Sequence, residues 1–127
     1  MIFGIGTDLV QVERIEATYR RFGEHFVDRL LMPEERALFD PGRRPVRFLA
    51  MRFAAKEAIS KALGTGFRHG VWIRDFGFKA NDWGKPEVIF SQRGRAVAER
   101  LGAAEGHVSL TDEAGLVVAV AVLMKKP

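Results

Sequence analysis

Residues 52–66 read Arg-Phe-Ala-Ala-Lys-Glu-Ala-Ile-Ser-Lys-Ala-Leu-Gly-Thr-Gly, and this stretch decides how the rest of the chain is interpreted. On a helix, Glu57 and Lys61 lie one turn apart on the same face. One side of this helix is apolar and comprises Phe48, Met51, Ala55, Ala58, Ile59, Ala62 and Leu63. The opposite side is mostly small, with one acid and one base, and comprises Ala50, Phe53, Ala54, Glu57, Ser60 and Lys61. We therefore expect a central helix from about Arg47 to Leu63 that is covered on both sides and stops at Gly64.

The charged pair on this helix has two interpretations. Glutamate followed four residues later by lysine is a common ion pair on exposed helices, where it contributes little to stability. The alanine-rich surroundings favour the second interpretation, in which Glu57 and Lys61 belong to a functional site, because a half-buried charged pair is costly to maintain.

The first ten residues, Met-Ile-Phe-Gly-Ile-Gly-Thr-Asp-Leu-Val, have the alternation of a strand. We expect its core face to consist of Phe3, Ile5, Thr7 and Leu9. The other face has Gly4 and Gly6, and glycine inside a strand often marks the close approach of another group. Asp8 follows on that face, where an aspartate is disfavoured unless it is paired or binds a cation. Helix capping is the alternative, but the next helical pattern begins too late, so we favour a ligand role for Asp8.

These motifs together resemble those of holo-acyl-carrier-protein synthase, the small bacterial type of 4′-phosphopantetheinyl transferase. The resemblance rests on residues 4–10, 48–50, 52–58 and 60–66, and it extends to Gly84-Lys85-Pro86 and His107-Val108-Ser109-Leu110. It covers essentially the whole chain, and its two main motifs are specific in combination.

Composition limits the class of protein. The 127 residues are enough for one domain, residues 1–127, and they carry 20 Lys and Arg against 16 Asp and Glu. The chain has no cysteine, which excludes a disulfide framework and a thiolate metal site. We find no signal segment and no apolar run of the roughly 20 residues that a bilayer requires. We expect a soluble cytoplasmic protein that does not associate with membranes.

The remaining pattern predicts the fold class. Residues 13–31 read as a helix loosened at Gly23, residues 33–39 as a short helix, and residues 71–79 and 87–90 as strands joined by a turn. Ser91 can cap a helix that runs to Leu101, and residues 107–111 and 116–125 read as a terminal hairpin. The order β-α-α-α-β-β-α-β-β predicts a single α+β domain with a largely antiparallel sheet packed against the long central helix. Because its last strand is apolar on both faces, we expect it to be central or covered by another subunit.

The resemblance implies a magnesium-dependent reaction in which a serine of apo-acyl carrier protein attacks coenzyme A and adenosine 3′,5′-bisphosphate leaves. Magnesium is typically held by one or two carboxylates and substrate phosphates, which suits Asp8 and Glu57 if strand and helix meet. Lys61 would stabilise the departing charge. The proton acceptor is Glu57 or a metal-bound water that it activates. This reaction belongs to fatty acid biosynthesis.

Further residues are expected to bind the coenzyme. Arginine suits phosphate because its fork donates two parallel hydrogen bonds, so Arg44 and Arg52 are candidates, with a solvated surface role as the alternative. Gly64 lies at the wrong end of a helix for anions and chiefly ends it, although its loop can still touch the coenzyme. Pro86 and His107 are implied by resemblance, with ordinary turn chemistry and a core histidine as their alternatives.

The first helix carries a basic stripe. Arg14 and Arg21 lie seven residues apart on one face, and acyl carrier proteins are acidic, so we expect this stripe to dock the carrier protein. A solvated face near Glu13 and Glu16 is the alternative. The family also implies a homotrimer with active sites between subunits. Relative to the family pattern, Thr111-Asp112 replaces a Ser-His pair, and Met32 replaces a capping Ser or Thr.

Two rival functions stay open at this point. A basic module that binds RNA or DNA would explain the sequence pI near 9.9, but the positive excess is modest and no aromatic motif interleaves with it. We therefore expect no nucleic-acid partner. A magnesium-dependent nucleotide hydrolase would keep the metal site and use water in place of serine.

Overall fold

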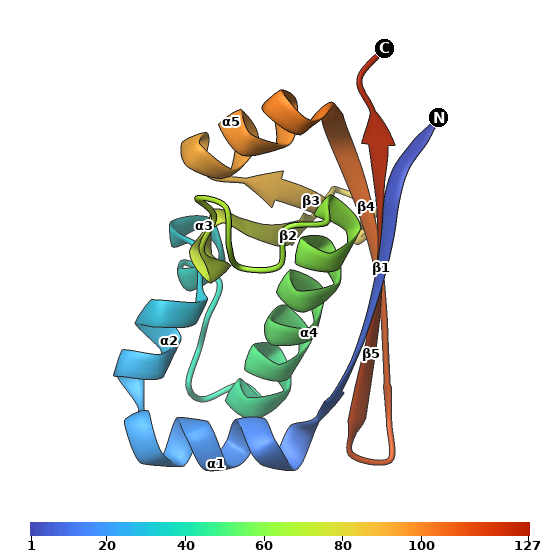
Figure 1. The fold of residues 1–127 in the computed structure, drawn as a ribbon. Coiled ribbons are helices and arrows are strands. Elements are labelled where there is room, and N and C mark those ends of the chain that lie inside the picture. Colours follow the sequence, from blue (N-terminus) through green and yellow to red (C-terminus); the bar gives the residue numbers. More distant parts are fainter.

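In the computed structural model, which describes residues 1–127, a five-stranded antiparallel sheet lies against one long helix (Figure 1). The strands are β1 (Ile2–Gln11), β2 (Phe76–Ala80), β3 (Pro86–Phe90), β4 (Ala103–Glu113) and β5 (Leu116–Lys125). Their order in the sheet is β1-β5-β4-β3-β2. This arrangement confirms the α+β prediction, and β5 lies inside the sheet, between β1 and β4, as its apolar sequence indicated.

The helices are α1 (Val12–Phe22), α2 (Glu24–Leu30), α3 (Pro33–Arg36), α4 (Pro45–Leu63) and α5 (Gln92–Leu101). The expected helix over residues 13–31 is therefore two helices, because Gly23 takes a positive φ of 54° that ends α1. The expected strand over residues 71–79 begins later, after a single 3₁₀ turn at Ile73–Asp75. Ser91 caps α5 as predicted, since its side chain accepts a hydrogen bond from Gly94 N.

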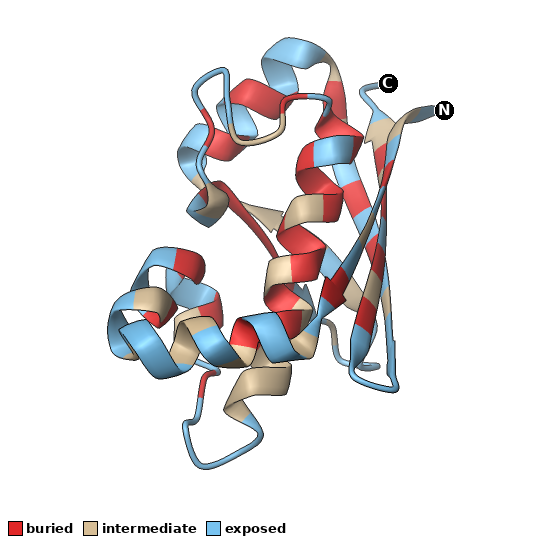
Figure 2. Cartoon of the chain, turned by 60° about the horizontal axis from the view of Figure 1, so that its bottom comes forward, coloured by how far each residue is buried: buried red, intermediate tan, exposed pale blue.

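Helix α4 is covered on both sides, as its alanine-rich sequence predicted (Figure 2). Strand β1 packs against it so closely that a Cβ at Gly6 would lie 1.9 Å from the carbonyl oxygen of Ala58. A Cβ at Gly4 would meet the carbonyl oxygen of Ala62 at the same distance. The two glycines are needed because the strand backbone lies directly on the helix backbone.

This packing overturns the expected core face of β1. Ile5 and Leu9 are 59% and 61% exposed, while Gly6 and Val10 on the other face are buried. The apolar residues were assigned to the core on hydrophobicity alone, but α4 can approach the strand only on the side that has no side chains in its way. Ile5 and Leu9 therefore lie on the outer side of the sheet, beside Val122 and Val118 of β5.

A cluster of three charged side chains lies inside the protein, at a place where the sequence predicted no site. Glu35 of α3 and Lys56 of α4 both have side chains with 0% exposure, and Arg52 completes this buried cluster. Lys56 Nζ donates to Glu35 Oε1 at 2.5 Å and to the Phe76 carbonyl at 2.6 Å, and Arg52 donates to the Phe78 carbonyl at 2.7 Å. The buried cluster thus fastens α3 and β2 to α4.

No helix of the structure is both long enough and apolar enough to cross a membrane.

Candidate active site

Three charged residues from β1 and α4 form what we call the open cluster: Asp8, Glu57 and Lys61. Asp8 lies opposite Ala119 of β5, on the sheet face that packs against α4. Lys61 Nζ donates to Asp8 Oδ1 at 3.2 Å and to the Thr7 carbonyl at 2.9 Å. The expected meeting of the first strand with the central helix is therefore present. The lysine pairs with the aspartate on the strand, and no ion pair joins it to Glu57 one turn away.

The open cluster has more negative than positive side chains, and this affects the pKa of Glu57. Partial burial raises the pKa of Glu57 above its ordinary value, and the neighbouring charge of Asp8 raises it further, while Lys61 offsets part of this rise. The cluster has two carboxylates and one ammonium group, which is bonded only to Asp8, so it keeps a net negative charge when both carboxylates are ionised. Such a site favours the arrival of another cation.

A cavity of about 320 Å³ opens beside the two carboxylates. Its lining comes from β1, α1, α2 and α4 and comprises Asp8, Leu9, Val10, Arg14, Ile15, Thr18, Phe26, Phe53 and Glu57. The predicted metal ligands and the predicted docking residue Arg14 therefore face the same space. An extended segment of another molecule that contacts α1 could reach the carboxylates through this cavity.

The donor set of the open cluster fits a hard divalent cation. Carboxylate oxygens are the ligands that magnesium prefers, and Lys61 already occupies one of them with a positive charge. No group of three or more His, Cys, Asp or Glu side chains in the structure could hold a metal ion without help. Magnesium commonly takes one or two carboxylates and completes its shell with substrate phosphates and water, so two protein ligands are enough.

The predicted coenzyme-binding residues are spread along α4. Gly64 ends this helix with a φ of 87°, and its N–H donates to the Ser60 and Lys61 carbonyls, as expected for a helix terminator. Arg44 precedes the same helix with a left-handed φ of 48°. Nineteen residues separate them, which corresponds to about 28 Å along the axis. Within one chain, Arg44 and Gly64 are not brought together.

Arg52 and Pro86 do share a cavity, of about 270 Å³, that Phe48 and Phe78 also line. The Arg52 guanidinium lies 4.5 Å from the Phe48 ring centre and 3.9 Å from that of Phe78. The solvated surface role given as the alternative is wrong, because Arg52 is only 8% exposed and bonded to Glu35 of the buried cluster, whereas its coenzyme role stays a prediction.

His107 lies elsewhere, on β4, with its side chain exposed. It is paired with Val122 across the β4–β5 ladder and lines a hollow of about 490 Å³ between β3, β4 and α5. Since Ile5 is also paired with Val122, these residues belong to the same outer face of the sheet. His107 is therefore a surface histidine and does not lie in the core.

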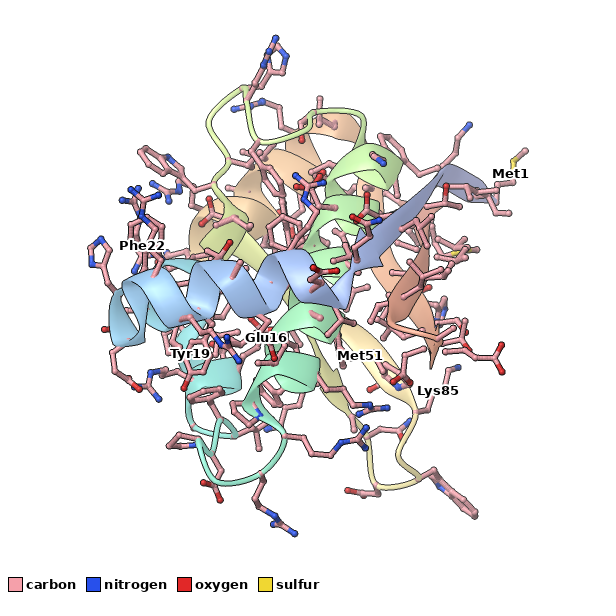
Figure 3. All side chains as sticks on the ribbon, turned by 90° about the horizontal axis from the view of Figure 1, so that it is seen from below. Met1, Glu16, Tyr19, Phe22, Met51 and Lys85 are labelled. Atoms are coloured by element: carbon pink, nitrogen blue, oxygen red, sulfur yellow. The ribbon has the colours of Figure 1, made fainter.

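The two docking candidates differ in position along α1. Arg14 lines the cavity with Asp8 and Glu57, whereas Arg21 lies further along the helix over the ring of Phe22, 5.1 Å from its centre. Figure 3 shows α1 crossing in front of α4, with Glu16 and Tyr19 labelled on the former and Met51 on the latter. The stripe therefore runs away from the open cluster along an exposed helix.

Sequence reasoning missed Glu35 and Lys56. Lys56 had a usable signal, because a lysine in the middle of a run of buried alanines must find a buried partner. Glu35 also replaces the missing cap at Met32, since its Oε1 accepts a hydrogen bond from Met32 N at 3.0 Å. Nothing in the sequence paired these two residues, which are 21 positions apart.

Comparison with known proteins supplies the family. Residues 4–121 match the model of the 4′-phosphopantetheinyl transferase superfamily. A holo-(acyl-carrier-protein) synthase from Vibrio vulnificus is 44% identical over 121 residues, covering 95% of this chain and 96% of the relative. The crystal structure of a holo-(acyl-carrier-protein) synthase from Neisseria meningitidis is 42% identical with a TM-score of 0.92, covering 98% of this chain and 100% of that one.

A third relative shows such a protein with a ligand. The holo-(acyl-carrier-protein) synthase from Bacillus anthracis, solved in complex with CoA (3′,5′-ADP), is 35% identical with a TM-score of 0.79 and 99% coverage of both chains. Each of these matches covers nearly the whole chain. The chain belongs to the holo-acyl-carrier-protein synthases of the 4′-phosphopantetheinyl transferase superfamily.

Proposed function

We propose that this protein transfers the 4′-phosphopantetheine group of coenzyme A to a serine hydroxyl of an apo-acyl carrier protein, with Asp8 and Glu57 as the ligands of a magnesium ion. The observation that carries the proposal is the convergence of these two carboxylates with Lys61 at one cavity, in a chain of this family. The relatives' names supply the reaction, and the open cluster supplies groups suited to it.

The transfer needs one new bond and one broken bond. The serine oxygen bonds to the phosphorus on the pantetheine side of the diphosphate, and the bond from that phosphorus to the bridging oxygen breaks, releasing adenosine 3′,5′-bisphosphate. A bound magnesium ion would neutralise charge on the diphosphate and polarise the phosphorus.

The chain's own residues position and neutralise the reacting groups. Lys61, at the exposed end of α4, can reach a diphosphate and offset the negative charge that develops on the leaving oxygen. Glu57 is our candidate for the proton acceptor, directly or through water, because its raised pKa brings it closer to the operating pH of a general base.

The acidic carrier protein would dock on α1. Arg14 lies at the rim of the cavity that holds the carboxylates, so a negative partner guided by Arg14 and Arg21 would present its serine to the open cluster. This geometry supports the docking assignment, and coenzyme A would approach from the side of Lys61 and Gly64.

We further propose a homotrimer whose active sites lie between subunits. Two observations support it: the outer face of the sheet exposes Ile5, Leu9 and Val120, and the predicted coenzyme residues Arg44 and Gly64 lie at opposite ends of α4 within one chain. Exposed apolar patches mark interfaces, and closed symmetry is the usual form of such assemblies. His107 on that face would then contact a coenzyme held by a neighbouring chain. We place the protein in the cytoplasm, in fatty acid biosynthesis.

Mass spectrometry of an apo-acyl carrier protein tests the function directly. Incubation with this protein, coenzyme A and magnesium should add one phosphopantetheine to the carrier, and EDTA should prevent the gain. Cleavage of coenzyme A in the absence of any carrier protein would indicate the rival hydrolase. No modification of several acidic carriers with magnesium present would reject the proposal.

A further inference from the structure

Lys61 is bonded to Asp8, one of the two carboxylates to which the proposed function assigns the metal. Its ammonium nitrogen lies 3.2 Å from Asp8 Oδ1 and also donates a hydrogen bond to the Thr7 carbonyl at 2.9 Å. The Asp8 side chain is 14% exposed, whereas that of Lys61 is 53% exposed. The lysine can therefore leave without disturbing the core, while the aspartate stays in place.

We propose that Lys61 is an internal counter-ion that occupies the cation position on Asp8 until coenzyme A binds, so that metal and coenzyme bind cooperatively. The inference rests on the proposed function for the identity of the two ligands. It adds an order of events: in the free protein the lysine competes with the metal for Asp8, and the coenzyme's diphosphate removes this competition.

The charges in the open cluster give the reason. In the free protein two carboxylates face one ammonium group. A divalent cation added alone competes with Lys61 for Asp8, and by binding there it leaves the ammonium beside a dication, which is repulsive. A diphosphate brings negative charge that can accept both the cation and the displaced lysine. The metal should therefore bind the free protein weakly and the coenzyme complex tightly.

Thermodynamic reciprocity makes the claim measurable. If coenzyme A strengthens metal binding by some factor, the metal strengthens coenzyme binding by the same factor. Removing the ammonium removes the competition for Asp8, so it should strengthen binding of the metal alone. The same change also removes a contact to the diphosphate, so coenzyme binding should weaken and the coupling factor should fall.

The experiment titrates Mn²⁺, an EPR-visible substitute for Mg²⁺, into the full chain with and without coenzyme A and without carrier protein. Lys61→Met removes the charge and keeps the length of the side chain. Without coenzyme, we expect this variant to bind Mn²⁺ about fivefold more tightly than the unaltered protein, which corresponds to about 1 kcal/mol, the upper end for a partly exposed ion pair. Circular dichroism checks that the variant is folded.

Arg14→Met is the matched control. Arg14 lines the same cavity as both carboxylates but makes no hydrogen bond or ion pair with either of them, so its loss removes one nearby positive charge and no competitor. We expect less than a twofold change in Mn²⁺ affinity. Equal tightening in both variants would mean that charge alone acts, and no tightening in Lys61→Met would mean that the lysine does not compete; either result overturns the proposal.

Failure of the proposed function would give different results from failure of this inference. In that case the unaltered protein would not modify any carrier protein, yet Lys61→Met would still bind Mn²⁺ more tightly than Arg14→Met. An unchanged coupling factor between coenzyme A and Mn²⁺ in Lys61→Met would reject the cooperative part of the proposal even with transfer intact.

Discussion

Helix α4 takes part in two charged clusters that differ in burial and in the sign of their net charge. The buried cluster surrounds one carboxylate, Glu35, with two cations and the N–H of Met32, and every buried polar side-chain atom in the structure has a hydrogen-bond partner. The open cluster places two carboxylates beside one ammonium group at a cavity. The buried cluster has all its hydrogen-bond partners within the protein, and it holds α3 and β2 against α4. In the open cluster, Glu57 has no ion pair, and the proposed function assigns a metal ion to this place.

Burial accounts for the contrast. Buried charges are costly unless they are fully bonded, so a closed cluster can persist only if it is complete. Burial lowers the pKa of Lys56 and Arg52, and the charge of Glu35 offsets part of that effect. In the open cluster, burial and the neighbouring charge of Asp8 both raise the pKa of Glu57. A fully bonded cluster and the proposed catalytic one thus lie on the same helix, and the following changes test whether their roles differ.

Removing the carboxylate from the buried cluster should have the largest effect. Glu35→Ala leaves Lys56 and Arg52 buried without their partner, and breaking a buried pair in this way costs about 3–5 kcal/mol. We expect a loss of that size in the free energy of unfolding, measured by urea denaturation. Arg36→Ala, which breaks exposed ion pairs to Glu24 and Asp28, is the control and should cost less than about 1 kcal/mol. Equal losses of unfolding free energy in Glu35→Ala and Arg36→Ala would contradict the distinction between the buried cluster and an exposed ion pair.

Neutralising the open cluster should affect activity and leave the fold intact. For Glu57→Gln we expect the transfer rate to fall below detection, by at least about 10²–10³-fold, because a group that acts on transition-state charge is removed. The initial rate of carrier modification measures this, and a thermal melt reports the fold. An undiminished rate in limiting magnesium would show that Glu57 is not a metal ligand.

Charge reversal at the rim of the cavity should act on one substrate only. We expect Arg14→Glu to raise the KM for the carrier protein about tenfold, equivalent to about 1.4 kcal/mol, and to leave the KM for coenzyme A unchanged. Steady-state kinetics with each substrate varied separately provides the measurement. Arg21→Glu should have the smaller effect because it lies further from the carboxylates. Equal changes in both KM values would reject a docking role.

The smallest expected effect is on how the free energy of unfolding depends on pH, compared between Glu57→Gln and the unaltered protein. The raised pKa of Glu57 means that the folded state binds its proton more tightly than the unfolded state, so the protein loses stability as pH rises from the unfolded pKa, near 4.5, through the folded value. Glu57→Gln should flatten this part of the profile and be slightly more stable than the unaltered protein at neutral pH, as urea denaturation at several pH values would show. A parallel profile for the variant would indicate that Glu57 titrates normally.

The site was more predictable than the packing around it. Asp8, Glu57 and Lys61 could be found because a carboxylate in an apolar strand and a charged pair among alanines both contradict their surroundings. The buried cluster escaped because its members are far apart in sequence, and only the packing of α3 and β2 on α4 brings Glu35 to Lys56. The place of Arg52 in this cluster was missed for the same reason, since the sequence suggested only coenzyme binding or a solvated surface role.

The amino-acid sequence by itself determined the order of the elements apart from the break at Gly23, the C-terminal ends of α4 and α5, and the residues of the open cluster, because these follow from local periodicity, capping and out-of-place charges. The tertiary structure alone decided which face of β1 is buried. Hydrophobicity favoured Ile5 and Leu9, but α4 lies against Gly4 and Gly6, where only a strand without side chains lets two backbones meet. Burial depends on what can approach a face, and that is a property of the assembled fold.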